Sequence, residues 1–303
     1  MAGEYYDVLF NKLYSDLQNV ADVMGVKDLK AYFKPHGGVR SHEIFRSFAI
    51  ALQGSTTMQS KIKMNDEEGE NYKVVRDVLF DFDVYKSADT YSSWEDIYKA
   101  ILDAGIKDEK PKEDKDTAWQ KYSKGLFDGI TLFYKKVDGR HGVDRIRSLV
   151  YVDVCELDDD EMGMIIDTIK AISKKIRGMG FALTCEWLKE CGCTYIAKPE
   201  AFLKKTIEYI VDPECERTVK DEEVLKEVFK WVKTTNAKRK KDKVTAYQID
   251  RIIYLLCTGD FYLDSCKFGR EIVNREIDSL RPEKKVENIE EADESEKAED
   301  TDK

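Results

Sequence analysis

A short segment with two glycines separates two helical patterns near the middle of the chain and could bind an anion. Gly178 and Gly180 flank Met179, and apolar residues repeat at helical spacing on both sides. Glycine permits a positive φ, and the first N–H groups of a helix have no partner within it. A DNA phosphate is an anion that such a helix N-terminus favours. An ordinary turn between two helices explains the same spacing, and short glycine motifs are weak evidence.

Basic residues stand directly before these glycines, and a second basic run lies further along the chain. Lys174, Lys175 and Arg177 flank the turn, so they are the better candidates for phosphate contacts. The second run could bind phosphates with salt-dependent affinity, but a solvated loop explains it equally well. It comprises Lys233, Lys238, Arg239, Lys240, Lys241 and Lys243.

Residues 172–207 resemble the helix-hairpin-helix of the endonuclease III-type DNA glycosylase superfamily. The resemblance implies that Gly178 and Gly180 grip one DNA phosphate, with a monovalent cation at the hairpin. In that family a catalytic aspartate follows near the start of a later helix. Glu200, which is 20 residues after Gly180, falls at the position of this aspartate.

The chain departs from the family pattern at several positions of this segment. Glutamate replaces aspartate at 200, and Ala182 stands where bifunctional members carry a lysine that forms a Schiff base. Phe202 and Lys205 replace a common histidine and a common arginine. The resemblance therefore implies a monofunctional enzyme, without lyase activity through that lysine.

A second match lies earlier in the chain. Residues 49–61, AIALQGSTTMQSK, are similar to the family segment Leu-Ser-x-Gln-x-Thr, whose glutamine fills the gap left by a flipped base. The resemblance gives this role to Gln53, although a polar residue that ends a helix beside Gly54 is an equal alternative. The family's iron–sulfur cluster is not supported, because only Cys257 and Cys266 lie near the end of the chain.

The chemistry of base excision can be argued from the residues as well. Hydrolysis of an N-glycosidic bond develops positive charge on the deoxyribose, and a nearby carboxylate stabilises that charge and orients water. The base must first leave the stack, at a cost of roughly a few kcal/mol. Glu200 could be this carboxylate, or it could simply favour a helix N-terminus after Pro199. Asp212 and Asp250 are weaker substitutes, and Trp187 or Tyr195 could stack on the base.

We therefore expect a protein that flips and hydrolytically excises a damaged or modified base from duplex DNA. Two alternatives stay open. One is a non-catalytic DNA-binding helix-hairpin-helix protein, which the glutamate and the missing lysine favour. The other is an all-α module for protein interactions, which the acidic balance of the chain favours.

Helical periodicity dominates the elements that would position these residues. Apolar faces run through residues 9–24, 44–52, 74–79, 97–102, 119–133, 162–176, 181–189, 202–210, 224–232 and 249–256. Ser93 and Thr245 are predicted N-caps, and Pro199 is predicted in the first turn of its helix. Gly125 and Gly129 are expected to allow close packing. Residues 149–154, LVYVDV, are ambiguous between a short strand and another buried segment.

These patterns predict an all-α fold with two lobes. Residues 1–281 form the glycosylase-like region, with a central lobe at about 36–196 and a second lobe from both chain ends. Residues 282–303 form an acidic tail with too few apolar residues to order itself. We find no internal repeat.

Composition limits the remaining possibilities. The net charge of the chain is −10, and residues 283–303 contribute −6 of it, which leaves the rest only mildly acidic. No apolar run has the length of a membrane span and no secretory signal is visible, so we expect a cytoplasmic protein. The seven cysteines are an odd number and fit reduced thiols better than disulfides or a metal site at Cys185, Cys191 and Cys193. We expect no cofactor.

Overall fold

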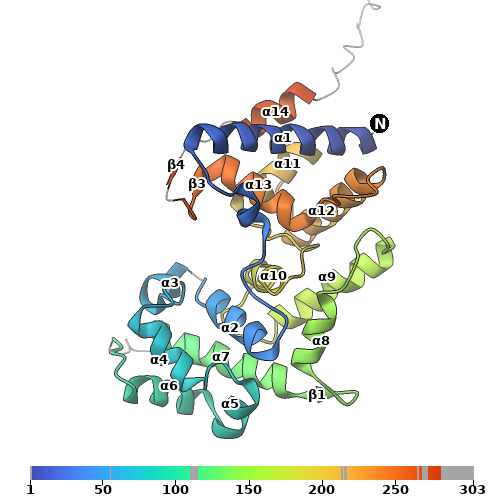
Figure 1. Ribbon diagram of the computed structural model, residues 1–303. Helices are drawn as coiled ribbons and strands as arrows, with labels where there is room; N and C mark the ends of the chain where they lie inside the picture. The colour runs from blue at the N-terminus through green and yellow to red at the C-terminus, as the bar shows by residue number, and fades with distance from the viewer. Residues whose placement is uncertain are drawn as a thin grey trace, which may run out of the picture.

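The computed structural model describes residues 2–54, 56–109, 115–212, 214, 217–264, 266–267 and 272–280. Within these residues the chain forms fourteen α-helices, one short 3-10 helix and two small antiparallel hairpins (Figure 1). The all-α prediction is confirmed. The acidic tail predicted at 282–303 lies outside the described residues.

The helices follow one another with short connections. In chain order they are α1 (Ala2–Met24), η1 (Leu29–Phe33), α2 (Ser41–Leu52), α3 (Thr56–Ile62), α4 (Glu70–Val78), α5 (Val84–Thr90), α6 (Trp94–Asp103), α7 (Ala118–Tyr134), α8 (Gly142–Leu149), α9 (Asp159–Ser173), α10 (Phe181–Glu190), α11 (Ala201–Val211), α12 (Asp221–Asn236), α13 (Ala246–Thr258) and α14 (Ile272–Leu280). The strands are β1 (Lys136–Val137), β2 (Arg140–His141), β3 (Asp260–Phe261) and β4 (Cys266–Lys267).

The helices pack in two groups with α9 and α10 between them (Figure 1). In the lower group of the figure, α7 contacts α2, α3, α5, α6 and α8. In the upper group, α1 packs on α12, α13 and α14, and α11 packs on α12, α13 and α14. Helix α10 contacts α2, and α9 contacts α12, so this helix pair joins the two groups.

Helix starts follow the polar residues of the sequence closely. Ser93 and Thr245 accept hydrogen bonds from the backbone N–H groups of Asp96 and Gln248, as the capping signals predict. Asp158 caps α9 in the same way, through Glu161. These caps satisfy N–H groups that the first turn of a helix leaves without partners.

One ambiguity is resolved and one local prediction is wrong. Residues 149–154 form no strand, because α8 runs to Leu149 and the following residues are turns whose Val154 is buried by packing. Pro199 is not in the first turn of α11, because the Glu200 N–H is taken by the Lys198 carbonyl at 2.7 Å. The helix therefore begins at Ala201, and Glu200 is its N-cap.

Candidate nucleic-acid interface

The turn between α9 and α10 is fixed to the core by its two apolar residues. Ile176 and Met179 are each 3% exposed, and the Met179 N–H donates to the Ile176 carbonyl at 3.2 Å. The residues between and beside them, including Gly178 and Gly180, are exposed. The turn therefore presents its backbone to solvent on a rigid base.

Asp128 of α7 holds the turn from the side. Its Oδ2 accepts from the Arg177 backbone N–H at 2.9 Å and from Nε at 2.7 Å, and its Oδ1 accepts from Nη2 at 2.7 Å. This pairing raises the pKa of the Arg177 guanidinium. Arg177 was predicted to contact DNA phosphate, but the structure uses its donors to position the turn.

Two glycines of α7 allow its neighbours to pack closely, the turn at Gly125 and the Phe48 ring of α2 at Gly129. A Cβ on Gly125 would lie 2.7 Å from the Arg177 carbonyl oxygen, and one on Gly129 would lie 2.3 Å from the Phe48 ring. Both distances are shorter than a Cβ tolerates. The predicted role of these glycines in close packing is confirmed.

The two glycines of the turn differ in their backbone. Gly178 has a φ of +83°, which an L side chain rarely adopts, whereas Gly180 has a φ of −75° and is the N-cap of α10. A Cβ on Gly180 would meet nothing within 4 Å. The N–H groups of Gly178, Gly180 and the first turn of α10 donate to no described residue. They are available to an anion.

Lys174 and Lys175 complete this surface. Both are exposed, and neither forms an ion pair with a described residue. The structure thus brings Lys174, Lys175, Gly178 and Gly180 together at one exposed turn. We refer to these four residues as the anion turn.

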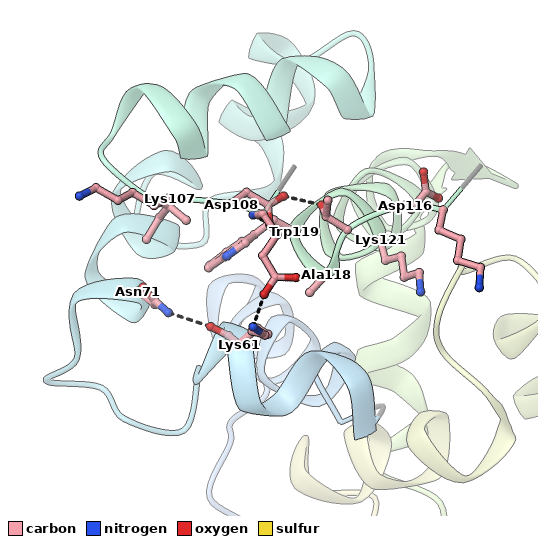
Figure 2. A pocket seen from close by; sticks show the side chains of 12 residues that line it. Lys61, Asn71, Lys107, Asp108, Asp116, Ala118, Trp119 and Lys121 are labelled. Atoms are coloured by element: carbon pink, nitrogen blue, oxygen red, sulfur yellow. Dashed lines mark hydrogen bonds and ion pairs between the residues drawn. The ribbon is translucent and has the colours of Figure 1, made fainter. Parts of the chain in front are cut away.

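A cavity of about 720 Å³ lies near the anion turn, between α3, the start of α7 and residues 106–109 (Figure 2). Helices α3 and α7 also border the turn, through Met58 near Gly178 and Asp128 at Arg177. The residues that line the cavity are Lys61, Asn71, Ile106, Lys107, Asp108, Glu109, Lys115, Asp116, Thr117, Ala118, Trp119 and Lys121.

The carboxylates of this cavity are already paired. Glu109 pairs with Lys61, Asp108 accepts from Tyr98 at 2.9 Å, and Asp116 pairs with Lys124 at 2.6 Å. Sequence reasoning did not find this cavity, because its residues come from separate segments and share no motif.

Glu200 lies at the N-terminus of α11, and its side chain is 49% exposed. It forms an ion pair with Lys198, whose side chain is 16% exposed. The predicted carboxylate is therefore accessible and has a cationic neighbour. The 720 Å³ cavity is not lined by Glu200.

A network of charges lies beneath Glu200, between α10 and α13. The Lys189 side chain is 2% exposed, and its Nζ is 2.7 Å from Asp250 Oδ2 and 3.0 Å from Glu186 Oε2. Burial opposes the charge of Glu186, but the Lys189, Lys198 and Arg251 cations outweigh it and lower the Glu186 pKa to about 2. Arg251 also pairs with Glu190 at 2.7 Å.

The structure gives local partners to two of the carboxylates considered from the sequence, and only Asp250 belongs to this network. Asp250 is 7% exposed and also accepts from the Lys198 N–H at 3.2 Å, so it has a structural role. Asp212 ends α11 and accepts from the Arg217 N–H at 3.0 Å. Sequence reasoning missed Lys189, although its spacing of four from Cys185 places it on the buried face of α10.

Gln53 does not lie on an open surface. It is 2% exposed, its Nε2 donates to Asn65 Oδ1 at 2.8 Å, and its Oε1 accepts from the Met64 N–H at 2.6 Å. Gln53 ends α2 and ties it to the segment after α3. Filling a gap in a DNA stack would require it to leave this position, so the structure supports the alternative of a residue that ends a helix.

The aromatic candidates are also part of the core. Trp187 is fully buried and its Nε1 donates to the Ile44 carbonyl at 3.1 Å, while Tyr195 is 4% exposed. Neither ring is accessible to a base in this structure. Their spacing near the turn reflects core packing.

Most of the second basic run is also engaged within the protein. Lys233 donates to the Leu157 carbonyl at 2.6 Å, Arg239 pairs with Asp7 at 2.8 Å, and Lys243 pairs with Asp153 at 2.8 Å. Lys240 and Lys241 are exposed and form no ion pair with a described residue. This run contributes fewer free cations than its sequence indicates.

The cysteines whose side chains the structure describes form no metal centre. Cys155, Cys185, Cys191, Cys193 and Cys257 are free thiols. Burial raises the pKa of Cys193 to about 12 and that of Cys257 to about 11, which keeps both protonated. No group of metal-binding side chains gathers within the described ranges.

Comparisons with known proteins do not assign the chain to a family. No protein-family model matches the chain, and no curated protein and no solved structure is significantly similar to it. In the described part of the chain, no helix combines the length and the apolar character required to cross a membrane.

Proposed function

We propose that this protein binds duplex DNA through the anion turn and hydrolyses the N-glycosidic bond of a damaged or modified base with Glu200. One observation carries the proposal. The anion turn has open backbone donors beside two unpaired lysines, and Glu186 of the following helix α10 is linked through Lys198 to the exposed carboxylate of Glu200.

Ion pairs link Glu200 to the helix that follows the anion turn. Glu186 lies five residues after the first residue of α10, which corresponds to about 8 Å along the helix axis. Glu186 is 3.7 Å from the Lys198 Nζ, and Lys198 pairs with Glu200. Glu200 is therefore linked to α10 through Lys198 and Glu186.

Each group has a defined part in the reaction. The N–H groups of Gly178 and Gly180 and the charges of Lys174 and Lys175 hold the phosphate without reading sequence. Glu200 stabilises the positive charge that develops at C1′ and orients the attacking water. Lys198 forms an ion pair with Glu200 and so positions its carboxylate.

An assay for abasic sites tests this proposal. The purified protein is incubated with duplexes that carry oxidised, alkylated, deaminated or hypermodified bases, and alkali then nicks every abasic site. We expect nicking by the wild type and loss of at least a hundredfold with Glu200→Gln, in line with the removal of a catalytic carboxylate. Glu208→Gln is the matched control, since it is on the same helix and its Oε1 accepts only the Val219 N–H at 3.0 Å.

The outcomes separate the remaining functions. Equal nicking by the wild type and Glu200→Gln would keep the enzyme but reject Glu200 as its carboxylate. Salt-sensitive binding without nicking on any duplex would establish the non-catalytic DNA-binding protein. The absence of salt-sensitive binding would leave the protein-interaction module.

A further inference from the structure

The loop between α12 and α13 carries a dense run of positive charge. Residues 238–243, KRKKDK, hold five cations and one aspartate, a net charge of +4. We refer to these six residues as the basic loop. Lys240 and Lys241 are exposed and form no ion pair with a described residue. DNA binding at the anion turn does not use this loop, so it does not explain its charge.

Hydrogen bonds hold the basic loop in a defined position. The Asn236 Oδ1 accepts from the Val244 N–H at 2.8 Å, and its Nδ2 donates to the Val244 carbonyl at 2.7 Å, so one side chain closes the loop. Arg239 pairs with Asp7 at 2.8 Å and donates to Asn11 Oδ1 at 2.6 Å, which ties the loop to α1. The two exposed lysines are therefore presented from a fixed base.

Residues 287–302 carry the opposite charge at the end of the same chain. They hold nine acidic residues and one lysine, a net charge of −8, and Ile289 is their one large apolar residue. We refer to them as the acidic segment, which lies outside the described residues. With so little apolar surface, its attraction to a protein surface is mainly electrostatic. A cationic surface is the partner that its charge favours.

Helix α1 brings the start of the C-terminal residues close to the basic loop. Helices α12 and α14 both pack on α1 (Figure 1). Glu276 of α14 pairs with Lys12 of α1 at 2.8 Å, and Arg239 of the loop bonds to Asn11, the preceding residue of α1. Helix α14 ends at Leu280, about one helical turn after Glu276.

The residues that lead from α14 to the acidic segment are long enough to reach the loop. Residues 281–286 can extend over about 20 Å. Glu276 and Arg239 contact adjacent residues of α1, whose Cα atoms are about 3.8 Å apart, so a connection of this length is sufficient. The anion turn also has unpaired lysines, but it borders α3 and α7 in the opposite group of helices. The tether therefore favours the basic loop.

A tether also makes weak contacts effective. A single exposed ion pair contributes little to stability, and salt screens it. A short link within one chain raises the effective concentration of the second partner to the order of millimolar. Several simultaneous contacts between the carboxylates and the loop can then hold the segment in place.

We propose that the acidic segment binds the basic loop of its own chain and neutralises it. This inference goes beyond the proposed function and does not depend on it. The bound segment covers Lys240 and Lys241 and withholds their amines from other polyanions. The partner of the basic loop is thus a part of the same molecule.

Carbodiimide crosslinking of the full-length protein tests this contact. The reagent joins a carboxylate to an amine that touches it, with loss of one water, and mass spectrometry of the peptides identifies both residues. We expect crosslinks from Lys240 or Lys241 to residues 287–302. Their yield should fall at least about fivefold in about 1 M salt, where the Debye length is about 3 Å. A mixture of isotope-labelled and unlabelled protein shows whether the joined residues belong to one chain.

Lys135 and Lys136 are the matched control for access of the reagent. Both are exposed and form no ion pair with a described residue, and they lie at the end of α7 in the opposite group of helices. They should crosslink to the acidic segment at least about fivefold less than the basic loop does, because the tether does not favour them.

Neutralisation of the acidic segment provides an independent measurement. The variant Glu290→Gln/Glu291→Gln/Glu294→Gln alters no residue of the fourteen helices within the described ranges. It should shift the backbone amide resonances of residues 238–243 and leave those of residues 135–140 unchanged.

Several results would overturn the inference. They are crosslinks from Lys135 and Lys136 at the same yield, predominant crosslinks to Lys174 and Lys175, and crosslinks that join two chains. Loop resonances that stay in place when the acidic segment is neutralised would overturn it as well. These measurements use no DNA, so their outcome is separate from the test of base excision.

Discussion

Gly178 and Gly180 illustrate how two glycines of one motif can have different roles. Gly178 has a positive φ, so it is required for the shape of the turn. Gly180 has an ordinary φ and open space around it, so only a bound ligand would require it to be glycine. Substitution of each should therefore affect a different property.

Gly178→Ala should lower the free energy of unfolding by about 1 kcal/mol, because the left-handed conformation costs about that much for a residue with a Cβ. The new Cβ would be 3.5 Å from the Met58 Cε, an ordinary contact, so strain and not collision should determine the loss. Gly180→Ala should leave stability within about 0.5 kcal/mol and weaken DNA binding severalfold, since a methyl group would stand among the phosphate donors. Urea unfolding and fluorescence anisotropy measure the two effects. Unchanged binding by Gly180→Ala would contradict a phosphate at this position.

The buried charges of the Lys189 network determine a second prediction. Asp250→Ala should destabilise the protein by about 3 kcal/mol, the lower end for breaking a buried ion pair, because Glu186 remains beside Lys189. The triple variant Glu186→Gln/Lys189→Met/Asp250→Leu should regain most of this loss, since it removes all three charges and fills the space. Thermal and urea unfolding provide the measurement. A loss under 1 kcal/mol for Asp250→Ala would show that Glu186 alone satisfies the ammonium.

At the scale of elements, α7 acts as the support on which the α9–α10 turn is built. Gly125 lets the turn approach, and Asp128 receives three donors from Arg177. If the turn binds DNA as proposed, a carboxylate beside it would oppose the phosphate by its charge. The hydrogen bonds between Asp128 and Arg177 would favour phosphate binding instead, because they hold the backbone of the turn in place.

Asp128→Asn distinguishes these two effects by the sign of the change in DNA affinity. The amide cannot accept all three donors of Arg177, so we expect a looser turn, faster amide hydrogen exchange at residues 176–180, and weaker DNA binding. The loss of global stability should be about 1 kcal/mol or less, because Arg177 is half exposed. Stronger binding would indicate instead that Asp128 acts mainly through its negative charge.

At the scale of the whole molecule, the arrangement of charge matters more than its sum. The net charge of −10 does not favour DNA binding, and several lysines and arginines are already engaged in ion pairs within the protein. Lys174 and Lys175 stay unpaired at the turn, and local charge of this kind determines where an anion binds.

Charge reversal of both lysines tests this view. Lys174→Glu/Lys175→Glu should weaken binding roughly tenfold or more for all DNA sequences alike, and the slope of log K against log salt should become shallower by about two. Lys135→Glu/Lys136→Glu is the matched control, an exposed pair about 15 Å further along α7 and β1 from Gly125. Equal effects of both double variants would reject the anion turn as the DNA contact.

The sequence alone determined ten of the fourteen helices in the described residues, while α3, α5, α8 and α14 were not predicted. Apolar spacing of three and four residues marks buried faces, and Ser93 and Thr245 cap helices through local hydrogen bonds that need no tertiary partner. The glycines at 178 and 180 likewise mark a break between helices, because their effect on the backbone is local.

Only the tertiary structure decided which polar residues are free to bind. Arg177 and Gln53 were expected to contact DNA, yet Asp128 and the segment after α3 take their hydrogen bonds. Lys189 is likewise paired with Asp250. The ion pair between Lys198 and Glu200 also depends on the turn that ends at Pro199. The physical reason is that hydrogen-bond partners distant in sequence are chosen by packing, whereas helical periodicity is carried by neighbouring residues.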